Sequence, residues 1–282
     1  MLRGIYTGAS GMLAQMDKLN VISNNIANVD TTGYKKDLTL NKAFPEMLLR
    51  RMNDNGVQRF PFGSVDFAPV VGKLGTGVET NEVYTQFTQG SMKVTENDFD
   101  LALEGEGFFS VMTPHGERYT RNGGFTLDPN GILVTKQGYQ VLGENGLIRL
   151  KENNFMIDQD GKIFINPEYA DDPERLVSSM ENDWEDSVLL DRLKIVDFKR
   201  TRELEKQGDS LWNITEFSGD AFVAEGNNRP KVHQGFLEGS NVNPVIEMVR
   251  MIEVNRNYEA NQKMIQTQDM LAGRLINETL KV

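Results

Sequence analysis

The C-terminal end of the chain contains a long stretch in which nothing interrupts a helix. Turn and N-cap residue types fill positions 239–243, and Pro244 suits the first helical position, where its missing N–H loses no hydrogen bond. From Val245 to about Leu280 there is no further proline, and Gly273 is the only glycine. The sequence therefore predicts a helix of roughly 35 residues, about 50 Å long. A compact domain of this size seldom needs a helix of that length.

Apolar residues along this predicted helix fall into two series with the 3–4 spacing of a helical face. The first series is Val242, Val245, Val249 and Ile252. The second series is Met251, Val254, Tyr258, Ile265, Ala272 and Leu275, with Asn261 and Gln268 at the polar steps between them. Two series predict two packing partners, although one broad buried side would give the same pattern. We expect Ile252 to face the chain's own N-terminal helix and Ile265 to face a neighbouring copy.

The N-terminal end carries a matching heptad pattern. Its members alternate steps of four and three and are Ile5, Ala9, Met12, Met16, Leu19, Ser23 and Ile26. A sustained seven-residue repeat favours a left-handed coiled coil. Turn formers follow at 28–33, where Gly33 suits a positive φ. The two chain ends are therefore predicted to pair as a coiled coil, and the apolar members of these series are the candidate interaction residues.

The middle of the chain reads as β structure, so the expected fold class is α+β. Four turn-forming dipeptides tolerate positive φ in tight hairpins: Asn122-Gly123, Asn130-Gly131, Asn145-Gly146 and Asp160-Gly161. Short β-favouring pieces such as 131–135 and 162–165 lie between them. Many short strands with frequent turns predict a small barrel or sandwich.

Four segments follow from these patterns. They are an N-terminal coiled-coil helix at 1–34, an extended linker arm at 35–90, a central β domain at 91–234 and a C-terminal coiled-coil helix at 235–282. Within the arm we expect a short helix near Phe44–Met52. The acidic stretch at 167–190 is expected to be a loop or a short helix.

Composition excludes several classes of protein. The 282 residues are 39% hydrophobic and 25% charged, as in a folded protein, and the net charge of −11 disfavours binding to nucleic acid. No apolar run is long enough to insert into a membrane. The N-terminus lacks the continuous apolar region of a secretory signal peptide, which by itself indicates the cytoplasm. The chain has no cysteine, so disulfides and thiolate metal sites are excluded.

No motif for catalysis, a cofactor or a metal withstands inspection. Gly105-Glu106-Gly107 lacks the third glycine of a dinucleotide loop, and Asp158-Gln159-Asp160-Gly161 lacks the rest of a calcium loop. His115 and His233 stand alone as possible metal ligands. We predict no catalytic residue, no cofactor and no metal. A soluble enzyme or carbohydrate-binding β module with helical ends remains the alternative from another class.

Three long motifs resemble the bacterial flagellar rod and hook proteins, the axial family, and they occur in that family's order. They are SGMLAQMDKLNVISNNIANVDTTGYK at 10–35, the pair DLALEGEGFF at 100–109 and YTRNGGF at 119–125, and QGFLEGSNVNPVIEMVRMIEVNRNYEANQKMIQTQDM at 234–270. The resemblance covers nearly all of the chain except about 36–90 and 150–230. It implies a structural, non-enzymatic subunit that polymerises through its terminal helices.

The resemblance also implies partners and a location. The partners are other copies of this chain, neighbouring rod and hook proteins and the flagellar type III export apparatus. Export occurs without a cleaved signal peptide and is followed by assembly in the cell envelope, which replaces the cytoplasmic expectation. The opening LRGIYTGAS and the motif GSNVNP at 239–244 look most like the proximal-rod type. The distal rod comes second, and the hook third.

Overall fold

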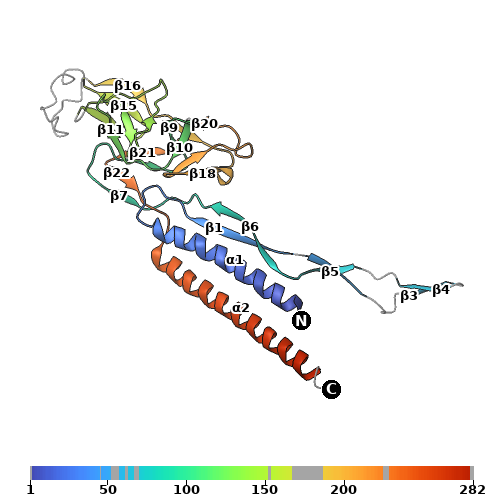
Figure 1. Cartoon of the computed structure of the whole chain (residues 1–282). Coiled ribbons are helices and arrows are strands. Elements are labelled where there is room, and N and C mark those ends of the chain that lie inside the picture. Colours follow the sequence, from blue (N-terminus) through green and yellow to red (C-terminus); the bar gives the residue numbers. More distant parts are fainter. Residues whose placement is uncertain are drawn as a thin grey trace. The chain divides into compact units, whose positions relative to one another are not determined.

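A computed structural model gives an α+β protein with a helix at each end and strands between them (Figure 1). The structure describes residues 2–44, 46–51, 57–60, 63–66, 70–151, 154–166, 187–224 and 229–279. The predicted loop at 167–190 lies almost entirely outside these residues. Residue contacts divide the chain into two compact units. The helical unit is Met1–Asn24, Asp37–Tyr84 and Val245–Val282, and the central unit is Asn25–Lys36 and Thr85–Pro244.

Both predicted terminal helices are confirmed. Helix α1 spans Leu2–Ala27, and helix α2 spans Pro244–Thr279 with the proline at its first position. After α1 the chain turns at Gly33, whose φ of +68° is the positive value the sequence suggested. Among the described residues, neither helix is long and apolar enough to cross a membrane.

The segment between α1 and the central unit is an antiparallel ribbon of extended strands. Its strands are β1 (Asp37–Ala43), β2 (Glu46–Arg50), β3 (Val57–Phe60), β4 (Gly63–Asp66), β5 (Val70–Gly75) and β6 (Val78–Thr85). They pair as β1 with β6, β2 with β5 and β3 with β4.

The expected short helix near Phe44–Met52 is wrong, because Glu46–Arg50 forms strand β2 and pairs residue by residue with β5. A segment this short cannot repay the cost of helix nucleation. Strand pairing with β5 satisfies its backbone instead.

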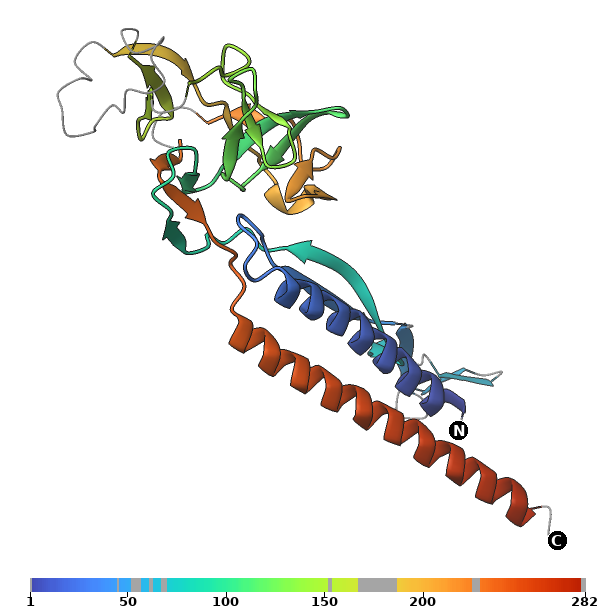
Figure 2. The same ribbon diagram turned by 60° about the vertical axis from the view of Figure 1, so that its left-hand side comes forward.

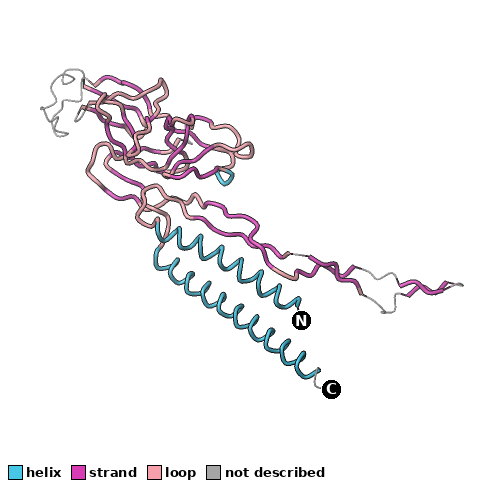
Figure 3. The backbone as a smooth tube through the Cα atoms, in the orientation of Figure 1, coloured by secondary structure: helices cyan, strands magenta, loops and turns pink. Residues whose placement is uncertain are grey.

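The central unit contains the remaining strands, which are short and are connected by loops (Figure 3). They are β7 (Met92–Val94), β8 (Leu101–Glu104), β9 (Phe108–Thr113), β10 (Gly116–Thr120), β11 (Phe125–Leu127), β12 (Leu133–Thr135), β13 (Gln140–Val141), β14 (Phe155–Ile157), β15 (Lys162–Ile165), β16 (Val188–Arg192), β17 (Ile195–Asp197), β18 (Glu205–Gly208), β19 (Leu211–Asn213), β20 (Phe222–Val223), β21 (Lys231–Gln234) and β22 (Phe236–Glu238), with a 3-10 turn at Thr201–Glu203.

The largest sheet runs in the order β11-β12-β13-β9-β10-β19-β18, with β17 joining β9 and β20. Strand β9 is its centre, because it pairs with β10, β13 and β17. Its apolar residues therefore lie in the middle of the core: Phe109 and Val111 have no exposed surface.

Two of the predicted hairpin dipeptides join paired strands as expected. Asn130-Gly131 turns β11 into β12, and Asp160-Gly161 turns β14 into β15, with both glycines at φ +74°. Asn122-Gly123 does not form a hairpin, because β10 and β11 pair with other strands. Its glycine instead lets the backbone touch the Leu101 carbonyl, where any Cβ would collide.

A buried ion pair lies where the two ends of the central unit meet. Lys35 Nζ is 2.6 Å from Glu238 Oε1, and neither side chain has exposed surface. Arg121 Nη1 lies 3.5 Å from the other carboxylate oxygen. The same carboxylate accepts the Gly90 N–H at 2.9 Å, and Lys35 donates to the Thr88 carbonyl at 2.9 Å. Burial lowers the pKa of Lys35, and the Glu238 carboxylate opposes that change.

Asn241, just before α2, is hydrogen-bonded to the segment that follows α1 and to the segment that follows β6. Its side-chain oxygen accepts the Lys36 N–H at 2.8 Å, and its amide donates to the Gln86 carbonyl at 2.8 Å. The Gly33 N–H donates to the backbone carbonyl of Glu238 at 2.8 Å. The chain leaving α1 and the chain entering α2 are thus bonded to each other within the central unit.

We expect Glu238→Gln to lower the free energy of unfolding of the central unit by about 3–5 kcal/mol, because a buried charge left without its partner is costly. Urea denaturation followed by tryptophan fluorescence measures the change. The control is Glu117→Gln, whose partner Lys194 is 2.7 Å away with both side chains 29% exposed. It should change stability by less than about 1 kcal/mol. Equal effects of the two changes would contradict the importance of the buried pair.

Tyr119 should make the central unit sensitive to alkali. Burial raises its pKa from the ordinary 10.0 to about 12. Between these values the unfolded chain loses the phenol proton and the folded chain keeps it, so stability falls as pH rises. The loss is at most about 3 kcal/mol. Tyr119→Phe should flatten the stability curve between pH 10 and about 12, and an unchanged slope would contradict this assignment.

Candidate assembly interface

The helical unit brings α1 and α2 side by side and antiparallel (Figures 1 and 2). Three glycines of α1 mark where they touch. A Cβ added at Gly8 would lie 2.9 Å from Ile265 Cγ1, and one at Gly11 would lie 3.0 Å from Asn261 Nδ2. At Gly4 it would collide with Gln268. Side chains of α2 therefore occupy space that only glycine leaves open.

The contacts identify which face of α2 meets α1. Asn261, Ile265 and Gln268 belong to the second series of the sequence pattern, and Val254 of that series is 2% exposed. Met251, Tyr258 and Ala272, which complete the row, are all half-buried. Leu275 lies near the C-terminal end of α2 and is 45% exposed.

The expectation that Ile252 faces α1 and Ile265 faces a neighbour is wrong. Val245, Val249 and Ile252 are 68%, 51% and 52% exposed, whereas Ile265 lies against Gly8. Ile252 and Val254 are two residues apart, which places them roughly 200° apart around the helix. The first series therefore lies on the side of α2 opposite α1. Val242 of that series is 7% exposed, but it precedes the helix and belongs to the central unit.

The apolar series predicted on α1 likewise lies on a different face from the row that contacts α2. Ile5, Met12, Leu19 and Ile26 are half-buried, and Met16 is 46% exposed. The row with Gly4, Gly8 and Gly11 at its start continues with the same spacing to Ile22, which is 4% exposed. A search for apolar residues could not find this row. The 4–3 spacing of the three glycines was the available signal.

A third face of α1 contacts the ribbon at strand β6 and just before it. The Val78 N–H donates to Ser10 Oγ at 3.2 Å, and Thr80 Oγ1 donates to Asp17 Oδ2 at 2.8 Å. Thr7 Oγ1 donates to the Thr76 carbonyl at 2.5 Å. These bonds run along α1 from Thr7 to Asp17, so the ribbon follows the helix.

Large apolar side chains remain exposed throughout the helical unit. On α1 they are Tyr6, Leu13 and Met16, at 74%, 61% and 46%. On the ribbon they include Phe44, Met47, Leu48, Leu49, Val70, Val71, Leu74, Val78 and Val83. On α2 they include Val245, Ile246, Met248, Val249, Ile252, Met264, Met270, Leu271, Leu275 and Ile276. Exposed apolar surface of this extent is typical of an interface between proteins.

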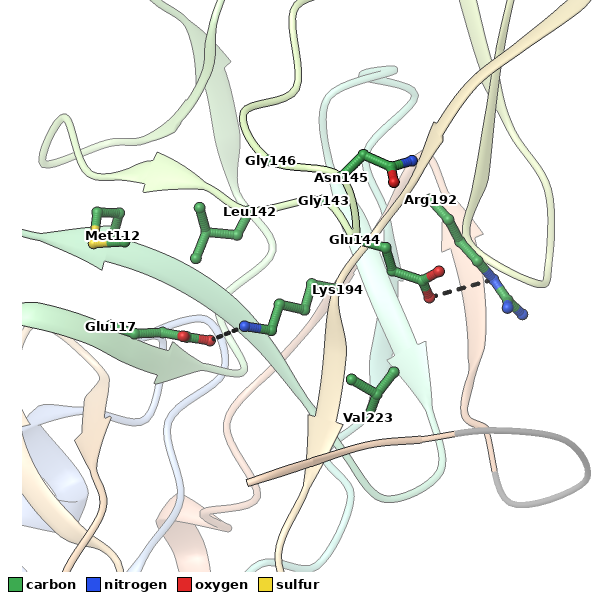
Figure 4. Close-up of a pocket in the computed structure, with 10 residues that line it drawn as sticks. All are labelled: Met112, Glu117, Leu142, Gly143, Glu144, Asn145, Gly146, Arg192, Lys194 and Val223. Atoms are coloured by element: carbon green, nitrogen blue, oxygen red, sulfur yellow. Dashed lines mark ion pairs between the residues drawn. The ribbon is translucent and has the colours of Figure 1, made fainter. Parts of the chain in front are cut away.

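One pocket of the central unit has a volume of about 780 Å³ and shows no catalytic arrangement (Figure 4). Its charged groups form ion pairs: Glu117 lies 2.7 Å from Lys194, and Glu144 lies 3.9 Å from Arg192 and 3.0 Å from Arg229. His233 is 2.8 Å from Glu104 on the surface. In the part of the chain that the structure describes, no three potential metal ligands come together.

Terminal helices with exposed apolar faces are typical of structural proteins that assemble through those helices. Comparison with known proteins identifies the family. Residues 5–35 match the family described as flagella basal body rod protein, residues 102–165 the flagellar hook protein FlgE/F/G D1 domain, and residues 233–278 the C-terminal family of the flagellar basal body rod FlgEFG proteins.

Relatives match along their whole lengths. The flagellar basal-body rod protein FlgG of Buchnera aphidicola subsp. Schizaphis graminum is 33% identical over 98% of this chain and 99% of its own. FlgG of Bacillus subtilis is 33% identical over 98% of this chain and 99% of its own. FlgF of Caulobacter vibrioides is 32% identical over 100% of both chains. The chain belongs to the flagellar basal-body rod family, which confirms the resemblance and makes it a structural protein, not an enzyme.

We expect Gly8→Ala to lower the thermal midpoint of helix unfolding, because the new methyl group meets Ile265 and overpacking costs about 1–3 kcal/mol. The control is Gly273→Ala, where an added Cβ meets open space. That change should stabilise α2 by about 1 kcal/mol through helix propensity alone. Circular dichroism at 222 nm follows both. Combining Gly8→Ala with Ile265→Ala should recover part of the loss, and additive losses would contradict direct contact.

Proposed function

We propose that this chain is a subunit of the flagellar rod that polymerises through α1 and α2 and transmits torque. One observation carries the proposal: each helix uses one row of residues for the intrachain contact and leaves a second apolar face exposed. On α2 the exposed face is Val245, Val249 and Ile252, and on α1 it is Tyr6, Leu13 and Met16. Removing these faces from water supplies the driving force for assembly.

The intrachain pair acts as a coiled coil in this proposal. A helix held along one seam by its own chain and along another by a neighbour resists sliding against both. Heterologous contacts that do not close generate a helical filament. In functional terms, residues 1–34 and 235–282 form the tube, residues 35–90 contact neighbouring subunits, and residues 91–234, as a small barrel or sandwich, cover the outside.

We place the subunit in the proximal rod, with the distal rod as the alternative and the hook third. The support is the resemblance of residues 2–10 and 239–244 to the proximal type. Identities of 33% to FlgG and 32% to FlgF do not separate the two positions. A cryo-EM map of basal bodies carrying a tagged copy would locate it directly, and density beyond the proximal segment would favour the distal assignment.

Delivery through the flagellar type III export apparatus, without a cleaved signal peptide, completes the proposal. The partners are other copies and neighbouring rod and hook proteins. Nucleic acid and membrane insertion have no part in it. The net charge of −11 supports the first of these exclusions.

We expect Met16→Asp to abolish assembly of the purified full-length chain, because it places a charge within an apolar interface. Sedimentation velocity over a concentration series measures assembly, and circular dichroism checks that the fold is kept. The control is Asn257→Asp, which adds the same charge at an exposed polar position of α2. Normal assembly by the Met16 variant would remove α1's outer face from the interface.

A further inference from the structure

A groove lies between α1 and the ribbon at Phe44 and residues 76–80, entirely within the helical unit. Its volume is about 550 Å³. Tyr6 and Leu13 of α1 line one wall, and Phe44 and Val78 of the ribbon line the other. These four side chains are 74%, 61%, 53% and 40% exposed. The groove therefore runs along α1 with large apolar side chains on both walls, and Ser10, Thr76 and Thr80 lie among them.

The ends of the groove differ in charge. Asp17 and Glu79 lie at the end farther from the N-terminus. Asp17 accepts a hydrogen bond from Thr80 at 2.8 Å, and Glu79 lies 2.9 Å from Lys42. Residues 4–16 of α1 contain no charged side chain. An occupant must therefore be apolar over most of its length and tolerate carboxylates at one end.

The outer row of α2 has these properties. Val245, Val249 and Ile252 form its apolar part, and exposed Arg256 follows one turn later on the same side. Tyr6 to Asp17 and Val245 to Arg256 are equal in length, each about 16 Å along a helix. This row lies on the side of α2 opposite α1, so a chain cannot place it in its own groove.

We propose that the groove receives the Val245–Arg256 row of α2 from a second copy. The inference rests on the proposed polymerisation and adds the pair of surfaces that meet. In a filament of identically oriented copies, the incoming α2 runs antiparallel to α1. The positive N-terminal end of its helix dipole then lies near Asp17 and Glu79. Arg256 lies over the exposed ring of Tyr6, where a cation–π contact is favourable.

This pairing fixes the offset between copies. Within one chain, Gly11 is level with Asn261, whereas the groove would hold Met251 of the neighbour at that height, because Tyr6 then lies opposite Arg256. The neighbour is therefore displaced along the helices by about 10 residues, or about 15 Å. Each copy carries one groove and one row, so the contact repeats without closing.

Other parts of the same α2 face fit poorly. Three turns later the row continues with Lys263, Gln266, Met270 and Gly273, of which only Met270 is a large apolar residue. Seating this part in the groove would bury a lysine among apolar walls. The groove therefore selects the first turns of α2 over the later ones.

Disulfide trapping tests the contact, because the natural chain has no cysteine. Full-length Leu13→Cys is mixed with full-length Val249→Cys, assembled and oxidised, and linked dimers are counted on a non-reducing gel. The control partner is Met270→Cys, which is 60% exposed on the same face of α2. Because disulfides need Cα atoms within about 7 Å, the Val249 mixture should give at least about tenfold more linked heterodimer than the Met270 mixture.

The outcomes separate this inference from the proposed function. If the mixtures assemble but Met270→Cys is linked as well as Val249→Cys, the contact is overturned and polymerisation through the helices stands. If the wild-type chain forms no assembly at any concentration, both fail. As an independent check, Val249→Asp should prevent assembly while Met270→Asp weakens it less, and the reverse order would overturn the assigned row.

Discussion

The ion pair between Lys35 and Glu238 is the constraint on which the path of the chain depends. It joins residues 203 positions apart, one just after α1 and the other just before α2. Both side chains are fully buried, so neither charge can return to water while the fold persists. The pair fixes, within the central unit, the two points at which the chain departs for its helices. Arg121 extends the same cluster to the central strands.

Sequence reasoning located both helices because their ends are set by local chemistry. Pro244 begins α2 and the turn at Gly33 follows α1, and both signals lie within a few residues of the boundary they define. It mispredicted which faces of the helices meet. The contact is made at Gly4, Gly8 and Gly11, and a search for apolar side chains does not detect glycines. The ribbon strand at Glu46–Arg50 was missed because its partner β5 is distant in sequence.

Each terminal helix has one face that contacts the other helix of the chain and a second, apolar face that is exposed. Contacts inside the chain combine glycines, the amides Asn261 and Gln268, and the apolar side chain of Ile265. Other large apolar side chains, among them Tyr6, Leu13, Val249 and Ile252, are exposed. The exposed apolar surface of the helices is therefore left for contacts with other copies in the proposed polymer.

The unequal lengths of the helices give the pair two chemically different ends. Helix α2 continues eleven residues past Gln268 to Thr279, whereas α1 begins only two residues before Gly4, which faces Gln268. At one end of the pair both helices are present, and at the other end α2 extends beyond α1. In the proposed polymer, this difference would give the assembly two unlike ends. Each subunit carries this asymmetry before it meets any other component.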